Sequence, residues 1–182
     1  LTLGLNWLEF GQGPQIATVD LYSGVSLAAS GDSGLGHSRT DKIFGVQSTK
    51  RFYQFALGLG YELRLMGTPD NADEMAVGNL QKLHATVAWM VSSDIQMVLE
   101  GSAYTLRAAD STASDNALTE KQTFGTIEPR LVLKLSPLVG MHLGATFRTN
   151  KASLANELVD ARLWEVNGLY GNSLFAGLNL TL

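Results

Sequence analysis

Two histidines, His84 and His142, lie in segments where polar and apolar residues alternate, and they occupy polar positions, as several carboxylates do. A histidine that is oriented by Glu62, Glu100 or Glu128 would have the arrangement that a general base needs. A histidine held by a carboxylate in a polar interior gives the same sequence pattern without any chemistry. Because no local spacing selects the first arrangement, we interpret both histidines as structural and predict no catalytic residue.

Ser102 and the third histidine, His37, widen the search for a reactive site. Ser102 and His84 fall on neighbouring predicted strands, so a serine–histidine dyad for acyl transfer is the enzymatic alternative. His37, His84 and His142 have neither the helical nor the hairpin spacing of metal ligands. The sequence therefore favours a protein that is not an enzyme and has neither a metal nor a cofactor.

Acidic residues gather in two predicted loops, with Asp70, Asp73 and Glu74 in one and Asp110 and Asp115 in the other. Carboxylates of this kind can hold Ca²⁺, or can bridge to lipopolysaccharide through divalent ions. A solvated acidic loop has the same composition and needs no ion. We expect the solvated loop.

Ten charged or titratable side chains share the polar parity of the predicted strands and would form one polar network in a barrel lumen: Glu62, Arg64, Lys82, His84, Glu100, Glu128, Arg130, Lys134, His142 and Arg148. Small residues such as Gly58 and Gly60 have the same parity, which suits a crowded interior. Enclosed charges must pair, because an isolated buried charge is strongly destabilising. We expect a structural network, with a narrow pathway for protons or small solutes as the alternative.

The clearest structural element in the sequence is the segment 53–65, YQFALGLGYELRL, which would position several of these polar side chains. Its odd positions are large and apolar, whereas its even positions are polar or small. Only a side-chain period of two separates two such faces, so the segment is predicted to be a strand. Its 13 residues are enough for the roughly 9–11 with which a tilted strand crosses a membrane.

The same alternation predicts strands elsewhere in the chain. The predicted segments are 1–7, 16–29, 80–91, 95–107, 126–135 and 141–150, with 43–51 as an ambiguous short strand and 164–182 as one long strand or a hairpin. Short turns at 92–94 and 136–139 alternate with long loops at 67–78, 108–121 and 151–162, the last with a possible helical turn. The fold class is therefore all-β, an antiparallel up-and-down transmembrane β-barrel of about 8–10 strands in one domain over residues 1–182.

Strand direction and one proline add two specific expectations. If 11–15 and 92–94 are turns at the same rim, 43–51 must be a separate strand and the chain must begin at the opposite rim. An even barrel would then need one more strand, from a missing N-terminal segment or from another chain.

Pro129 cannot donate a ladder hydrogen bond, so we expect a bulge or a strand end there.

Composition excludes several classes of protein. The 182 residues have 45% hydrophobic residues, a formal net charge of −4 and no cysteine. There is no continuous apolar run of transmembrane-helix length, so a membrane location requires strands. The acidic balance argues against nucleic acid as a partner. The first ten residues alternate and lack the features of a signal peptide.

The face that meets lipid is indicated by aromatic residues on the apolar parity near strand ends. The predicted aromatic girdle comprises Trp7, Tyr53, Tyr61, Trp89, Phe147, Trp164 and Tyr170. Such girdles mark the interfaces of membrane barrels. A soluble lipocalin-like carrier would also alternate, with its apolar residues inside.

The closing residues 174–182, LFAGLNLTL, resemble the C-terminal assembly signal of small bacterial outer-membrane β-barrels of the OmpA and OmpX type, with Leu182 where that class usually has Phe. The resemblance is one of architecture and implies a Gram-negative outer-membrane location. It also implies lipids and lipopolysaccharide as surroundings. Members of that class share no chemistry. We therefore expect a structural or interaction role in the envelope, with another envelope protein as a candidate partner; the alternatives are a narrow pore, a lipid-modifying enzyme or the soluble carrier.

Overall fold

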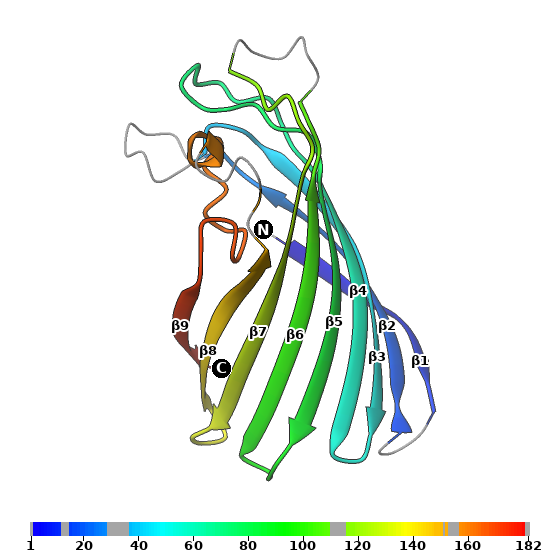
Figure 1. Ribbon diagram of the computed structural model, residues 1–182. Helices are drawn as coiled ribbons and strands as arrows, with labels where there is room; N and C mark the ends of the chain where they lie inside the picture. Colours follow the sequence, from blue (N-terminus) through cyan, green and yellow to red (C-terminus); the bar gives the residue numbers. More distant parts are fainter. Residues whose placement is uncertain are drawn as a thin grey trace.

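The computed structural model describes residues 2–11, 15–28, 37–109, 116–150, 152 and 157–180 of the chain. These residues form an all-β structure with one short 3-10 helix (Figure 1). The strands are β1 (Thr2–Phe10), β2 (Ala17–Ser26), β3 (Asp41–Phe52), β4 (Phe55–Leu65), β5 (Leu80–Met90), β6 (Ile95–Leu106), β7 (Gln122–Lys134), β8 (Val139–Asn150) and β9 (Ser173–Leu180), and the helix η2 spans Glu157–Ala161.

The nine described strands pair in sequence order, and each pair is antiparallel. Figure 1 shows a curved wall with short connections at one end, which we call the turn end, and long connections at the other, which we call the loop end. The prediction of an antiparallel up-and-down sheet is confirmed. Among the described residues, no helix is both long enough and apolar enough to span a membrane.

The sheet is open, although the sequence predicts a closed barrel. β1 pairs only with β2, and β9 pairs only with β8, among the described residues. Both edge strands run from the loop end to the turn end, because the number of described strands is odd and every pair is antiparallel. The two edges therefore cannot close on each other as an antiparallel pair.

The ambiguous segment 43–51 is part of β3, a full strand that pairs with β2 and β4. It is thus a separate strand, as the direction argument requires. Tyr53, predicted to begin the next strand, instead lies in the turn between β3 and β4 with a left-handed φ of 53°. The turn places its ring in solvent, with 67% of the residue exposed.

Pro129 does not end its strand and makes no bulge, contrary to the prediction. β7 continues through it, and Pro129 is the Cα partner of Leu99 on β6. On the other side, the ladder to β8 resumes at Arg130 and Gly144 in the same register. The bulge between these strands lies at Gly125 and Thr126 instead. The missing N–H is tolerated because only the β8 side of the ladder is interrupted.

The prediction of a strand over 164–182 is wrong for its first half. β9 begins only at Ser173. Residues 157–172, which we call the cap segment, contain η2 and three residues with positive φ, namely Arg162, Gly168 and Gly171. Left-handed residues break the extended backbone, so the apparent alternation of this stretch does not form a strand.

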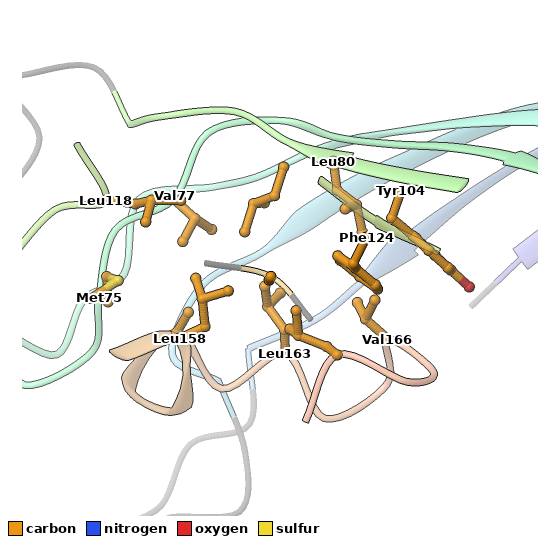
Figure 2. Packing of buried hydrophobic residues seen from close by; sticks show 13 residues of the cluster. Met75, Val77, Leu80, Tyr104, Leu118, Phe124, Leu158, Leu163 and Val166 are labelled. Carbon is orange, nitrogen blue, oxygen red and sulfur yellow. The ribbon is translucent and has the colours of Figure 1, made fainter. Parts of the chain in front are cut away.

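A hydrophobic core lies at the loop end, which we call the loop-end core (Figure 2). It joins the connections after β4 and β6 to the cap segment and comprises Met75, Val77, Leu80, Tyr104, Leu106, Leu118, Phe124, Ala152, Leu158, Ala161, Leu163, Val166 and Leu169. Tyr104 and Phe124 stack at 4.7 Å between ring centroids. Parts of the connections after β4 and β6 are thus packed against each other and against the cap segment.

Candidate functional site

The side chains of the sheet divide between two faces. Large apolar side chains on one face are exposed, for example Leu59 at 64% and Leu83 at 59%. Polar side chains on the other face are covered, for example Arg64 at 9% and Glu128 at 7%. This is the reverse of a water-soluble sheet, in which the apolar face is the covered one. We call the two sides the apolar face and the polar face.

Glu100 is the first centre of the polar face. Lys82 Nζ lies 2.9 Å from its Oε1, and Arg130 Nη2 lies 3.7 Å from its Oε2. Ser102 Oγ donates a hydrogen bond to the same carboxylate at 3.1 Å. These contacts join strands β5, β6 and β7 by charge-assisted interactions.

Glu128 is the second centre, and it is the Cα partner of Glu100. Two carboxylates directly opposite each other on neighbouring strands repel. Arg130 relieves this repulsion, because its Nη2 also lies 2.8 Å from Glu128 Oε1. Thr146 Oγ1 and Asn167 Nδ2 donate to Glu128 Oε2 at 3.2 and 3.1 Å.

Glycines on the polar face make room for rings from the neighbouring strand. A Cβ atom on Gly45 would lie 2.0 Å from the Tyr22 ring, and one on Gly60 would lie 2.3 Å from the His84 ring. The hydroxyl of Tyr22 thereby reaches Glu62 on β4 and donates to it at 3.0 Å. Larger residues at these glycines would push the rings out of the network.

The histidines form no catalytic arrangement among the described residues. Ser102 is the Cα partner of His84, yet its hydroxyl donates to Glu100, and no described hydrogen bond joins it to His84. His142 packs beside Phe175 with ring centroids 6.1 Å apart. The serine–histidine dyad therefore has no support in the geometry.

One described group has the composition of a metal site, formed by His37, Asp41 and Glu165 with ligand atoms within 4.8 Å of one another. Both nitrogens of His37 already have partners, Ser26 Oγ at 3.0 Å and the Arg39 carbonyl at 2.7 Å. Asp41 pairs with Arg39 at 3.3 Å, and Glu165 pairs with an arginine of β4. Two neighbouring guanidinium groups disfavour a cation here, so we assign no metal to this group.

Arginines of the sheet and its loop end hold the cap segment. Arg64 forms an ion pair with Glu165. Arg148 Nη1 donates to the Leu169 carbonyl at 2.9 Å, and Arg39 Nη1 donates to the Ala161 carbonyl at 2.7 Å. The cap segment is thus fastened over the polar face at the loop end.

A fully buried ion cluster, which no sequence pattern predicts, completes this attachment. Arg39 pairs with Asp41 and Glu74, and all three side chains have 0% exposure. Glu74 also accepts hydrogen bonds from the backbone and hydroxyl of Ser38. Glu74 is therefore not part of a solvated acidic loop, whereas Asp70 and Asp73 are exposed. Residues 110 and 115 lie outside the described part of the chain.

The predicted polar network is partly assembled. Contacts within the network join Lys82, Glu100, Glu128 and Arg130. Glu62, Arg64 and Arg148 bind other partners, and Lys134 is exposed near the turn end.

The residues of the predicted aromatic girdle lie in different parts of the structure. Tyr61, Trp89 and Phe147 lie exposed on the apolar face, and Trp89 stacks on Phe55 with ring centroids 6.0 Å apart. Trp164 and Tyr170 lie in the cap segment, where their rings are 4.7 Å apart. The side chain of residue 7 lies outside the described part.

A hollow of about 610 Å³ lies on the apolar face. Trp89, Met97, Leu99, Pro129 and Leu143 contribute to its lining. The hollow lies among exposed apolar side chains, whereas the polar face carries paired charges.

Comparison with protein-family models, with curated proteins and with solved structures finds no match for this chain.

Proposed function

We propose that the chain is the wall of an integral outer-membrane β-barrel with a structural or interaction role. The observation that carries this proposal is the inverted arrangement of the sheet, with apolar side chains exposed and paired charges covered. Contiguous apolar patches of this extent on a protein surface mark contact with a membrane or a partner. Here the apolar surface follows every strand, so a lipid bilayer is the surrounding that fits it.

The dimensions of the apolar face agree with a bilayer. β4 presents apolar side chains outward at every second position from Phe55 to Leu65. Ten residue steps of about 3.3 Å give about 33 Å, and the strand tilt of outer-membrane barrels reduces this to about the 25 Å of their apolar band. Phe55 and Trp89 stand at the turn end of this band, where an aromatic girdle is expected.

The polar face supports a structural role more than a chemical one. Its central carboxylates are paired with Lys82 and Arg130, and its serine donates to Glu100. Paired charges hold strands together but leave no poised nucleophile or base. We therefore place the interactions of this protein on its surface, with membrane lipids and lipopolysaccharide around the wall and another envelope protein as a further partner.

The proposal is tested by flotation with liposomes. The protein refolded into liposomes is washed with alkaline carbonate and centrifuged through a density gradient, and a second sample is transferred to buffer without detergent. We expect the protein to float with the lipid after the wash and to aggregate without detergent. A monodisperse protein in plain buffer that leaves the lipid on washing would contradict the proposal.

A further inference from the structure

The hydrogen-bond ladder between β7 and β8 is interrupted within the wall. The ladder pairs on either side of the interruption are Ile127 with Phe147 and Arg130 with Gly144. This register places Pro129 opposite Ala145, and no described ladder pair joins them. Proline has no N–H, so the ladder hydrogen bond that this position would donate is missing.

The hollow of about 610 Å³ on the apolar face lies over this interruption, since Pro129 and Ala145 are both in its lining. Larger side chains of the flanking strands line it as well, among them Leu99 and Leu174. The two leucines are level with the short residues, because Leu99 is the Cα partner of Pro129 and Leu174 is that of Ala145. The surface is therefore hollowed where two short residues stand between longer ones.

The hollow occupies one half of the apolar band. Its lining reaches Trp89 at the turn end, which is level with Phe55. In the other direction it reaches Phe147, which the register from β4 to β8 places level with Leu59, close to the middle of β4. The four residue steps from Phe55 to Leu59 span about 13 Å, which is about half of an apolar band of about 25 Å. The hollow thus has the depth of a single leaflet.

The lining of the hollow favours hydrocarbon. Among the described residues that line it, Arg130 alone is charged, and its guanidinium already contacts Glu100 and Glu128 on the polar face. A polar ligand would lose its water here without gaining a partner. A transmembrane segment of another protein would cross both leaflets, whereas the lining ends at the level of Leu59. A single acyl chain has both the chemistry and the length of the hollow.

We propose that this hollow binds one acyl chain of a phospholipid from the leaflet at the turn end, and binds it more tightly than the rest of the apolar face binds the surrounding lipid. This inference rests on the proposed function, because it requires the apolar face to lie in a bilayer. A chain in the hollow contacts side chains around it, whereas a chain on a convex part of the wall contacts them on one side only. The additional contacts supply the additional affinity.

Native mass spectrometry tests the site through the lipid that the protein retains. The protein is refolded into liposomes of phosphatidylglycerol with a minor part of lipid A, is floated after a carbonate wash, and is extracted into detergent. The mass of each complex then identifies the retained lipid and the number of molecules bound. Flotation of each variant shows that it has inserted.

Two variants fill the hollow from different strands. Ala145→Phe places a ring in it from β8, and Val87→Phe does so from β5, at a position that is 46% exposed. Ala85→Phe is the matched control, since Ala85 has the strand and parity of Val87 but lies outside the lining. If Ala145→Phe fails to insert, Val87→Phe decides the outcome.

We expect the wild type to retain one phospholipid. Loss of contact with about two methylene groups weakens binding about tenfold, so the ratio of lipid-bound to lipid-free protein should fall about tenfold in the two filled variants and stay unchanged in the control. Retention of lipid A in place of phospholipid, equal retention in all variants, or no retained lipid in a wild type that floats would each overturn the inference. A wild type that does not float would overturn the proposed function itself.

Discussion

Arg39 shows at the scale of single residues how the loop end is held. Its guanidinium contacts Asp41, Glu74 and the Ala161 carbonyl, and it joins the connection before β3, the connection after β4 and the cap segment. Removal of one partner from a buried ion pair leaves a buried charge without compensation. The free energy lost in this way is larger than the net stabilisation that the pair provides. The arrangement therefore makes three distant segments depend on one another.

The substitution Glu74→Ala tests this dependence. We expect it to lower the free energy of unfolding by about 1–3 kcal/mol, because Arg39 and Ser38 lose a buried acceptor while Arg39 keeps its ion pair with Asp41. Urea unfolding of the detergent-refolded protein measures the change. Asp73→Asn is the matched control, since Asp73 is the exposed neighbour in the same loop. Equal, small effects of both substitutions would show that the buried cluster does not hold the loop end.

Tyr170 forms hydrogen bonds with two backbone groups elsewhere in the cap segment. Its hydroxyl accepts from the Leu163 N–H at 2.9 Å and donates to the Leu158 carbonyl at 2.8 Å. Tyr170→Phe leaves both groups without this partner, and we expect a loss of about 1–3 kcal/mol in the free energy of unfolding. Proteolysis of the folded protein, with cleavage sites identified by mass spectrometry, should show faster cleavage within 157–172. An unchanged cleavage rate would mean that the hydroxyl is dispensable.

The same hydroxyl predicts a pH dependence. Burial raises the pKa of Tyr170 to about 12, with the negative charge of Glu165 acting in the same direction. An unfolded tyrosine ionises at about pH 10. The stabilisation by the neutral hydroxyl is thus complete below about pH 10 and is lost as the pH rises towards 12. The difference in unfolding free energy between wild type and Tyr170→Phe should shrink over this range, and a constant difference would contradict the assignment.

At the scale of elements, β4 offers a test of which medium its apolar face meets. In water, a charge at the exposed Leu59 would change stability by no more than about 0.5 kcal/mol. At the middle of a bilayer, Leu59→Arg should cost about 2–4 kcal/mol. Leu135→Arg at the turn end is the matched control with similar exposure, 58% against 64%, and should cost about 0–1 kcal/mol. Urea unfolding from liposomes measures both, and equal costs would place Leu59 outside the hydrocarbon.

The strands were predictable because each one is indicated by a pattern of neighbouring residues. In β4 a period of two is visible within any six residues, and the structure places Leu57, Leu59 and Tyr61 on one face. The same rule failed in the cap segment, where Trp164, Val166 and Tyr170 share a parity by coincidence. Val166 packs with Leu163 and Leu169 at a spacing of three residues, a signal for turns or 3-10 structure that was available in the sequence.

The residues of the polar face could be predicted from the sequence, but the contacts between them could not. Parity places Glu100, Glu128 and Arg130 on one side of the sheet, but it does not determine register, and register decides that the two carboxylates stand opposite each other. The Arg39–Glu74 pair spans 35 residues of sequence, and no local pattern connects its members. The positions of such pairs are set by tertiary packing.

At the scale of the whole molecule, the inverted faces and the open edges point to the same surroundings. A sheet with an exposed apolar face and two unpaired edges is a hazard for aggregation in water. In a bilayer the first feature is required, and the backbone groups of the edge strands must find partners there. Both features therefore require that lipid covers the apolar face.

Fluorescence quenching by lipids with brominated acyl chains tests this claim most directly. The chain has three tryptophans. Trp89 on the apolar face and Trp164 in the cap segment are almost equally exposed, at 42% and 46%. Trp7→Phe/Trp164→Phe leaves only Trp89, and Trp7→Phe/Trp89→Phe leaves only Trp164. If lipid covers the apolar face, Trp89 is strongly quenched and Trp164 weakly, whereas equal quenching, or an unquenched Trp89, would show that lipid does not cover it.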